Sequence, residues 1–362
     1  MNRENEILNL IRQNPMITQD EIAEKLGIKR STVGVHISRL EKKGIIRGRG
    51  YLINEDTYVA GVGSLNLDIY GKSSGDLKIH YDHPGHISAN IGGVTHNIME
   101  NLSRLQVPVR FVTAAGNDLF GKILLNECRE AGIDVSESVE IEDASSGVFM
   151  QILDDKNDMY LALTEMRVFE HLTPELLKTR MPMLCGAAAV VCDPALPVES
   201  LRFLTELPVP VFIDPTSEAL AEKIRDLAGG FYFIKPNLKE LSVLTGMEVH
   251  DEKSVMKAGK ALLEKGTGVV CVSMGEKGCI YMDAEGHYYK RKLKPVRNMV
   301  NASGAGDAFM AAMVCGHVRH MDTKQMIDHA MAAGIAAVMS EKVINPAFSA
   351  DLIETILKER KK

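Results

Sequence analysis

Short apolar runs alternate with helical segments along most of the chain, from Tyr58 to the C-terminal end. Apolar runs without polar alternation are typical of strands covered on both faces, whereas longer amphipathic stretches indicate helices. The pattern predicts an α/β fold with helices on both faces of a mostly parallel central sheet. Strands are expected at 59–62, 109–113, 187–192, 209–213, 231–234 and 269–272, and helices at 118–131, 218–227, 238–244 and 254–265.

Two regions interrupt this alternation and predict a small second sheet. Segments 148–153 and 159–163 are joined by Asp154-Asp155-Lys156-Asn157, a combination typical of a β-hairpin. Segment 67–81 is polar and also strand-like. We expect these segments to form a small β lid that lies over a substrate.

The first 55 residues follow the pattern of three short helices and a hairpin. Thr18 and Glu21 have the spacing of a capping box at the start of the second helix. Ser31 is expected to cap the third helix, and segments 45–47 and 51–53 to form two short strands. This order resembles a winged helix-turn-helix domain.

Charge is divided unevenly between these two parts of the chain. The formal net charge is −6 at pH 7, but residues 1–55 carry about +3 and the rest about −9. A basic segment on an acidic body is a reason to look for a nucleic-acid site in that segment. We therefore predict two domains, a winged helix-turn-helix domain at 1–55 and an α/β domain at 57–362.

Cysteine spacing and hydropathy indicate the cellular compartment of the protein. None of the six cysteines lies in a C-x-x-C pair, which argues against a zinc finger or a redox motif. The N-terminus lacks the features of a signal peptide, and no run approaches the roughly 18 apolar residues of a membrane span. We expect a cytoplasmic protein with reduced thiols and no membrane partner.

The strongest chemical signal is the string Asn301-Ala302-Ser303-Gly304-Ala305-Gly306-Asp307 ahead of an Ala- and Met-rich helical stretch. Small side chains let backbone N–H groups approach an anion, and the helix N-terminus adds partial positive charge at the same point. A carboxylate there can take the proton of an attacking hydroxyl. The alternative is a glycine turn in which Asp307 only caps the helix.

Further polar and glycine-rich strings follow predicted strands, where open α/β sheets bind ligands. They are Ser64-Leu65-Asn66-Leu67-Asp68, Gly92-Gly93-Val94-Thr95-His96-Asn97, Gly116-Asn117-Asp118-Leu119-Phe120-Gly121, Lys235-Pro236-Asn237-Leu238-Lys239-Glu240 and Ser273-Met274-Gly275-Glu276-Lys277-Gly278. Taken singly, each could be a turn, an Asx-turn or an exposed helix carboxylate.

Together, in this order and spacing, the strings resemble the ribokinase or PfkB-type kinase family, over 306 of the 362 residues. The resemblance implies a three-layer ribokinase-like fold and transfer of phosphate from ATP, with Mg²⁺. The roles it implies are Asp307 as the catalytic base with an anion hole at Gly304, Ala305 and Gly306; substrate binding by Asn66, Asp68, Gly92, Gly93 and Asn97; ATP binding by Asn237, Ser273, Gly275, Gly278, Gly304 and Gly306; and Glu240 acting on Mg²⁺ through water.

Some positions depart from the family pattern, and others indicate a particular branch of the family. Asn301 stands where many members have an aspartate that helps to bind a monovalent cation, so potassium activation is not expected. The glycine-rich strings look closest to bacterial pseudouridine kinases, although Thr95-His96 and Thr164-Glu165 depart from that branch. We predict phosphorylation of the 5′-hydroxyl of a nucleoside such as pseudouridine. The alternatives are a free pentose or ketohexose, and a ligand-sensing regulator with weak or no catalysis.

The N-terminal segment carries basic and polar side chains where a helix-turn-helix contacts DNA. Lys29, Arg30, Ser31 and Thr32 begin the third helix, while Arg47 and Arg49 lie in the expected wing; we predict that all six contact DNA. A solvated face used for dimerisation or regulation is the alternative. Because two half-sites need two copies, we expect a homodimer, joined through the edges of the lid.

Overall fold

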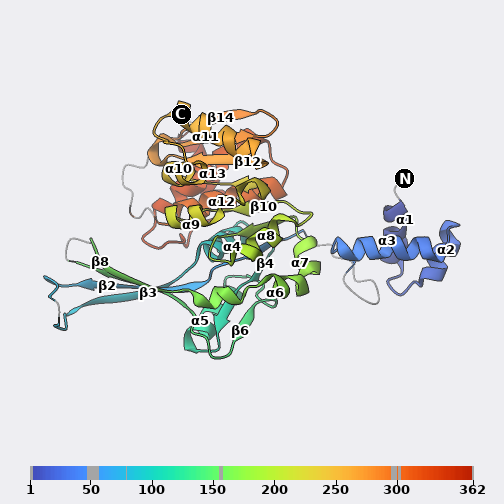
Figure 1. The fold of residues 1–362 in the computed structure, drawn as a ribbon, viewed down its shortest axis with the longest axis horizontal. Helices are drawn as coiled ribbons and strands as arrows, with labels where there is room; N and C mark the ends of the chain where they lie inside the picture. Colours follow the sequence, from blue (N-terminus) through green and yellow to red (C-terminus); the bar gives the residue numbers. More distant parts are fainter. Residues whose placement is uncertain are drawn as a thin grey trace.

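A computed structural model of the protein describes residues 3–46, 57–78, 80–154, 158–294, 300 and 303–360. Figure 1 shows three parts: an α/β body, a β lid that projects from it, and a head of three helices at the N-terminal end. Throughout the described residues, no helix has the length and apolar character needed to cross a membrane.

A central sheet of eight strands organises the body, in the order β14-β13-β12-β11-β10-β9-β1-β4. All strands from β12 to β4 are parallel, as the sequence predicts, whereas β13 and β14 add an antiparallel edge that it did not predict. The strands are β1 (Val59–Val62), β4 (Val109–Val112), β9 (Ala189–Cys192), β10 (Val211–Ile213), β11 (Phe233–Ile234), β12 (Val269–Ser273), β13 (Cys279–Asp283) and β14 (Tyr288–Arg291).

Helices cover both faces of this sheet because successive strand residues point to opposite sides. Val191 packs into one core with α4 (Val94–Arg104), α5 (Leu119–Glu130), α12 (Ala305–Val318), α13 (Thr323–Val338) and α14 (Ala350–Arg360). Val190 packs into the other with α6 (Pro174–Thr179), α7 (Met181–Cys185), α8 (Val198–Thr205), α9 (Glu218–Ile224), α10 (Leu238–Thr245) and α11 (Glu252–Glu264). The predicted three-layer fold is confirmed.

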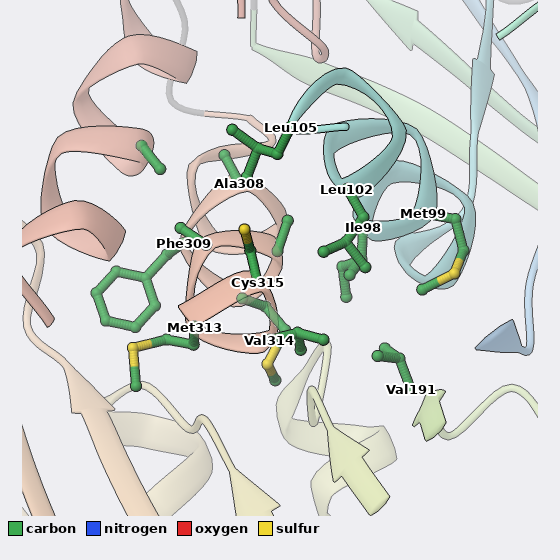
Figure 2. Packing of buried hydrophobic residues seen from close by; sticks show 14 of the residues in the cluster. Ile98, Met99, Leu102, Leu105, Val191, Ala308, Phe309, Met313, Val314 and Cys315 are labelled. Carbon is green, nitrogen blue, oxygen red and sulfur yellow. The ribbon is translucent and has the colours of Figure 1, made fainter. Parts of the chain in front are cut away.

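Helix α12 is enclosed along most of its length, since all residues of 308–316 are buried. Figure 2 shows α12 and α4 side by side, with Val314 of α12 toward Ile98 of α4 and Val191 of β9 below them. An apolar circumference is what a fully enclosed helix requires. The packing fixes the first turn of α12 close to the N-terminal end of α4.

The lid is a four-stranded sheet in the order β3-β2-β7-β8, with the predicted hairpin as β7 and β8. Cross-strand pairs give it two unlike faces. One face carries Asp68 beside Asn90 and Phe149, and the other carries Ile69 beside Met150. The strands are β2 (Asn66–Ser73), β3 (Gly85–Gly92), β7 (Gly147–Leu153) and β8 (Met159–Glu165), so the strand expected over 67–81 ends at Ser73.

Shorter elements complete the body. Strands β5 (Ala114–Gly116) and β6 (Val139–Ile141) form a parallel pair beside the main sheet. The 3₁₀ turns are η1 (Arg167–His171), η2 (Ala228–Gly230) and η3 (Gly275–Lys277).

The N-terminal head, residues 3–46, consists of α1 (Arg3–Gln13), α2 (Gln19–Leu26) and α3 (Arg30–Lys42) around their own apolar core. The Thr18–Glu21 capping box forms as predicted. The cap predicted at Ser31 is wrong: Lys29 occupies the cap position of α3, so Ser31 already lies within the first turn. The predicted strand 51–53 and most of the wing lie outside the described residues.

The head docks on α7 of the body through Gly44, the second residue after α3. Gly44 has φ of +68°, and a β-carbon there would lie 2.4 Å from the Pro182 carbonyl oxygen and 2.5 Å from the Gly186 amide nitrogen. Only glycine permits both this left-handed backbone and this close approach. Tyr58 joins the contact, because its hydroxyl donates to the Met183 carbonyl oxygen at 2.5 Å.

Substituting Gly44 by alanine should weaken this docking. Gly27 offers a matched control, since its φ of +63° is similar but nothing lies within 4 Å of a β-carbon there. We expect Gly27→Ala to cost about 1–2 kcal/mol from left-handed strain alone. Gly44→Ala should lower the thermal midpoint of the full chain by more, because it also displaces α7. Equal midpoints for the two variants would contradict the docking described here.

Candidate active site

Charged and polar side chains line up where the parallel strands end. Asp193 follows β9, Asp214 follows β10, Lys235 follows β11 and Ser273 ends β12. These strands are neighbours in the sheet, so their carboxyl ends form one row. The Lys235 ammonium pairs with Asp214 at 2.9 Å, with both side chains buried. Sequence analysis did not single out Asp193 or Asp214 and gave Lys235 no role of its own, because only the strand order makes the three residues neighbours.

The first turn of α12 lies over this row. Gly304 has φ of +76° and caps the helix, and a β-carbon there would lie 2.2 Å from the Val343 carbonyl oxygen. A β-carbon on Gly306 would lie 3.2 Å from the Lys235 ammonium nitrogen. The amides of Ala305 and Gly306 belong to the first turn and have no acceptor within the helix. The glycine-rich string therefore brings free backbone donors to the charged strand ends.

Asp307 lies at this helix start and is half-buried. Burial raises its pKa to about 7, and the negative charges of Asp214 and Asp193 act in the same direction. A hydrogen bond from Asn97, whose side-chain nitrogen donates to Oδ2 at 2.8 Å, and the charge of Lys235 oppose that rise. A carboxylate whose pKa lies near neutrality is suited to accept a proton at physiological pH.

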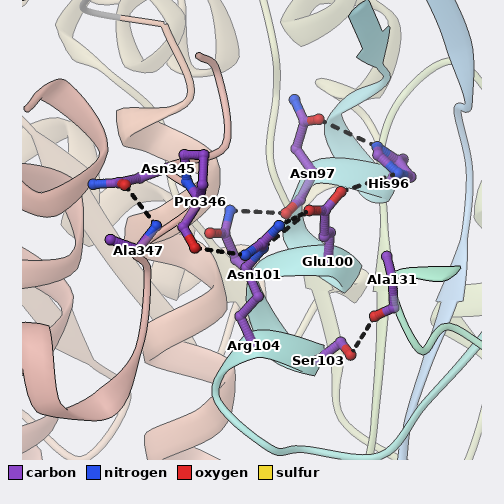
Figure 3. Close-up of polar contacts among 10 residues, drawn as sticks. All are labelled: His96, Asn97, Glu100, Asn101, Ser103, Arg104, Ala131, Asn345, Pro346 and Ala347. Carbon is purple, nitrogen blue, oxygen red and sulfur yellow. Dashed lines mark hydrogen bonds and ion pairs between the residues drawn. The ribbon is translucent and has the colours of Figure 1, made fainter. Parts of the chain in front are cut away.

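Asn97 is itself held in one orientation by its neighbours on α4 and beyond. Figure 3 shows His96 beside the Asn97 amide, with Nδ1 of the ring 3.3 Å from Oδ1. Burial lowers the pKa of His96, and the charge of Glu100 opposes this fall. The Asn97 side-chain oxygen faces the ring, which leaves the amide nitrogen to donate to Asp307. At the far end of α4, Arg104 donates to the Pro346 carbonyl oxygen at 3.0 Å, which ties the helix to the segment after α13.

On the lid side, Asp68 and two glycines meet beside α4. The Asn66 amide donates to Asp68 Oδ1 at 2.5 Å, and a β-carbon on Gly92 would lie 2.4 Å from Asp68 Oδ2. Gly93 has φ of +104° and caps α4. Burial raises the pKa of Asp68 to about 6. The predicted substrate residues Asn66, Asp68, Gly92 and Gly93 therefore gather at the base of the lid, and Asn97 connects them to Asp307.

Asp193 organises the segment that carries these residues. Its Oδ2 accepts hydrogen bonds from the backbone amide and the hydroxyl of both Ser64 and Thr95, at 2.5–3.1 Å. Ser64 begins the path to Asn66, and Thr95 lies in the first turn of α4. One buried carboxylate thus joins the end of β1 to the start of α4.

A cavity of about 450 Å³ opens on the other side of the α12 turn. Lys235, Ala305 and Gly306 line one end of it, and apolar side chains such as Phe309 and Ile335 line the remainder. The predicted nucleotide residues Ser273, Gly275 and Gly278 also border it, whereas Asn237, Gly304 and Glu240 do not.

Asn237 and Glu240 form a capping box at the start of α10. Glu240 accepts from the backbone amide of Asn237 at 2.9 Å and from its side-chain nitrogen at 2.7 Å. Burial raises the pKa of Glu240, and the negative charge of Asp214 raises it further. The hydrogen bond from the Asn237 backbone amide acts against this rise. Both carboxylate oxygens are thus engaged, so Glu240 fits contact with a hydrated Mg²⁺ better than direct ligation.

Among the described residues, no group of three His, Cys, Asp or Glu side chains is arranged to hold a metal by itself. Asn301, on which the expectation about potassium depends, lies outside the described residues.

A second cavity of about 890 Å³ adjoins the base of the lid. Thr164 and Glu165 of β8 line it together with Pro194 and Ala195, which follow Asp193. Thr164 is on the same lid face as Asp68, because both residues pair with Phe149. Asp68 and the other predicted substrate residues are not among the residues that line this cavity.

The head presents the predicted DNA-contacting side chains to solvent. Lys29, Arg30, Ser31 and Thr32 are all exposed, and Arg30 lies 3.2 Å from Asp20 of α2. Arg47 and Arg49 lie outside the described residues.

Two Escherichia coli (strain K12) proteins are similar to the chain over most of its length. The sugar kinase YeiI, itself uncharacterized, is 34% identical over 352 residues, which cover 97% of this chain and 97% of YeiI. A pseudouridine kinase is 29% identical over 300 residues, which cover 82% of this chain and 95% of that enzyme.

Solved structures share the fold of the body. A Clostridium perfringens protein assigned as a sugar kinase superposes with a TM-score of 0.76 at 26% identity, covering 85% of this chain and 97% of that one. An Escherichia coli protein assigned as ribokinase II, in complex with ATP and Mg²⁺, superposes with a TM-score of 0.71 at 18% identity, covering 84% and 99%.

Two family models match separate parts of the chain. The model of the pfkB family carbohydrate kinases matches residues 56–350, and that of winged helix-turn-helix DNA-binding domains matches residues 3–47. The chain therefore belongs to the pfkB family of carbohydrate kinases and is a sugar or nucleoside kinase with a winged helix-turn-helix domain ahead of its kinase fold.

Proposed function

We propose that the protein transfers the terminal phosphoryl group of ATP to the 5′-hydroxyl of a nucleoside such as pseudouridine. The observation that carries the proposal is the position of Asp307, a half-buried carboxylate whose pKa is raised to about 7. It lies between the cavity bordered by Gly306 and the substrate residues reached through Asn97.

In this proposal Asp307 accepts the proton of the attacking hydroxyl. The acceptor oxygen forms a bond to the γ-phosphorus while the bond from that phosphorus to the oxygen it shares with the β-phosphate breaks, releasing ADP. The amides of Ala305 and Gly306, aided by the helix N-terminus, stabilise the charge on the transferred group. Asp68 and Asn66 hold the acceptor hydroxyls by accepting and donating hydrogen bonds.

ATP and Mg²⁺ are proposed as the co-substrate and the metal. The apolar part of the 450 Å³ cavity suits an adenine ring, with Ser273, Gly275 and Gly278 at its border and Lys235 and Gly306 at its phosphate end. Glu240, held by Asn237, would act on the metal through water. A bound Mg²⁺ would neutralise charge on the phosphate oxygens.

The second cavity favours a nucleoside over a free sugar as the acceptor. It is bordered by Thr164, which lies on the lid face that carries Asp68, and its volume would accommodate a base attached to the sugar. Similarity to a pseudouridine kinase over 95% of that enzyme supports the same class. A free pentose or ketohexose is the alternative, and its use would leave this cavity unfilled.

Replacing Asp307 by asparagine tests the chemistry. Asparagine cannot accept the proton, so turnover should fall at least about 10²-fold, the scale of a lost general base. The measurement is ADP release with Mg-ATP against nucleosides, pseudouridine, ribose and fructose. Asp226→Asn, at an exposed position, is the control and should leave turnover unchanged.

Each outcome of that assay has a definite meaning. Turnover near the wild-type level in Asp307→Asn would show that Asp307 is not the base. An active wild type that prefers ribose or fructose would replace the nucleoside assignment. If the wild type phosphorylates none of the acceptors but binds one of them, a ligand-sensing regulator becomes the better account of this protein.

The head is proposed to bind DNA through the exposed N-terminal end of α3, with Lys29, Arg30, Ser31 and Thr32 toward the duplex. Arg47 and Arg49 are proposed to contact the backbone beside it. We take residues 1–55 as the DNA-binding domain and 57–362 as the kinase domain. A cytoplasmic location, with ready access to ATP and DNA, stays a prediction.

The double substitution Lys29→Ala/Arg30→Ala should weaken binding to a mixed-sequence duplex and flatten its salt dependence. Each lost phosphate contact should lower the slope of log K against log salt by about one. Fluorescence anisotropy between about 50 and 200 mM salt measures both quantities. Lys178→Ala, at an exposed lysine of the kinase domain, should change neither. Failure of the wild type to bind the duplex at low salt would argue for a regulatory or dimerising head.

A homodimer is proposed through the apolar face of the lid. Ile87 and Leu163 are 74% and 62% exposed there, and Leu161 and Met150 add to the same face. Exposed apolar patches of this kind mark interaction surfaces. A second copy of the chain fits this surface best. The apolar face and the face that carries Asp68 lie on opposite sides of the lid sheet, so burying the apolar face in a dimer leaves the acceptor side open.

Placing charge on this face should separate the two copies. We expect the wild type to have twice the 39.8 kDa chain mass in light scattering, and Leu161→Glu/Leu163→Glu to have the monomer mass. Leu119→Glu, at a residue that is 71% exposed outside the lid, is the matched control and should remain dimeric. A monomeric wild type at micromolar concentration would remove the proposal.

A further inference from the structure

Lys235 is a buried cation at the phosphate end of the proposed nucleotide cavity. Its side chain is only 6% exposed, and its ammonium lies 2.9 Å from Asp214 Oδ2. It borders the cavity beside Ala305 and Gly306. The nitrogen lies 3.2 Å from the point that a β-carbon on Gly306 would occupy, so it rests against the first turn of α12.

Negative charges surround this ammonium. Burial alone would lower the pKa of Lys235, but the charges of Asp214, Glu240 and Asp307 outweigh burial and raise it. The lysine therefore stays protonated across the physiological range. ATP would bring further negative charge to a place where these carboxylates already gather, so a fixed cation there opposes the repulsion.

We propose that Lys235 is a further residue of phosphoryl transfer: Asp214 holds its ammonium at the first turn of α12, where it binds an oxygen of the transferred group. This inference rests on the proposed kinase function. Lys235 keeps its protons during the reaction, while the hydroxyl proton passes to Asp307 and the broken bond leaves ADP. The lysine contributes positive charge where the transition state spreads negative charge over the phosphoryl oxygens.

The backbone around Lys235 holds the side chain in this position. The Lys235 amide donates to the Ile213 carbonyl oxygen at 3.3 Å, and Ser273 donates to the Pro236 carbonyl oxygen at 2.9 Å. Asp214 Oδ1 also accepts from the Thr216 amide at 3.0 Å, which fixes the carboxylate. The ammonium is therefore oriented before ATP binds, as electrostatic stabilisation of a transition state requires.

A purely structural ion pair makes different predictions. Replacing both members of a buried pair by neutral groups is often harmless to stability, whereas removing one leaves an unpaired charge. The test variant is therefore Lys235→Met/Asp214→Asn, which removes both charges together. Lys235→Arg keeps the charge in a larger group, and Lys239→Met, on the exposed neighbouring lysine, is the control.

Binding and turnover are measured together on the full-length protein. The double variant should bind Mg-ATP at least about tenfold more weakly in calorimetry, a loss of about 1.4 kcal/mol, and bind Mg-ADP almost as before. Its kcat should fall about 10²–10³-fold, the scale of one lost transition-state donor. The KM for the acceptor should change little, and Lys239→Met should match the wild type throughout.

The pH profile tests how the two charges of the pair act on Asp307, whereas the difference between the ATP and ADP affinity losses is the readout that a structural role would not move. Asp307 must be ionised to accept a proton, so wild-type activity should rise with pH and level off above about 7. The groups that face Asp307 are Asp193, Asp214, Lys235 and the Asn97 amide. Lys235→Met alone should shift the rise to higher pH, and Asp214→Asn alone should shift it to lower pH.

The outcomes separate this inference from the proposed function. Turnover of the double variant within about threefold of wild type, less than 1 kcal/mol in transition-state stabilisation, would make the pair structural and leave the kinase assignment intact. Equal losses of ATP and ADP affinity would also overturn the role at the transferred group. If the wild type turns over no acceptor, the kinase proposal fails, and the ATP and ADP affinities still decide whether Lys235 meets the terminal phosphate.

Discussion

The candidate site depends on one half-buried carboxylate, Asp307, at the start of an enclosed helix. Burying a charge is costly unless other groups compensate for it. Here the Asn97 amide donates to it, the Lys235 ammonium lies nearby, and the dipole of α12 favours a negative end group. Each compensating group comes from a different element, so α4, α12 and the ends of β10 and β11 must meet. The apolar packing of α12 against α4 secures that meeting.

Glycine governs how closely these elements approach. At Gly304, the capping conformation and the Val343 carbonyl oxygen leave no room for a β-carbon. At Gly306, the missing side chain lets the Lys235 ammonium rest against the helix backbone. The first turn of α12 consequently serves both proposed binding regions, because Gly306 borders the cavity and the next residue, Asp307, accepts a hydrogen bond from Asn97. Transfer between two substrates requires such proximity, because the reacting atoms must come within about 3–3.5 Å.

The sequence predicts individual elements better than it predicts their neighbours. The strand at 59–62, the β7–β8 hairpin and the Thr18–Glu21 cap follow from local pattern and are confirmed. The row Asp193, Asp214 and Lys235 was missed because each residue follows a different strand and only the strand order joins them. The sequence motif at Asn237 and Glu240 predicts a role in binding metal and phosphate. That the two residues also form a helix cap is known only from the hydrogen bonds in the structure.

The position of Tyr58 gives the head and the kinase domain a common element. Its hydroxyl bonds the Met183 carbonyl oxygen in α7, against which Gly44 packs, and the Arg110 guanidinium lies 4.0 Å from its ring centre. Tyr58 immediately precedes β1, whose end leads to Ser64 and the Asp193 network. A shift of β1 on acceptor binding would therefore alter the surface on which the head rests. By linkage, DNA that favours one docking of the head must then change acceptor affinity by the same factor.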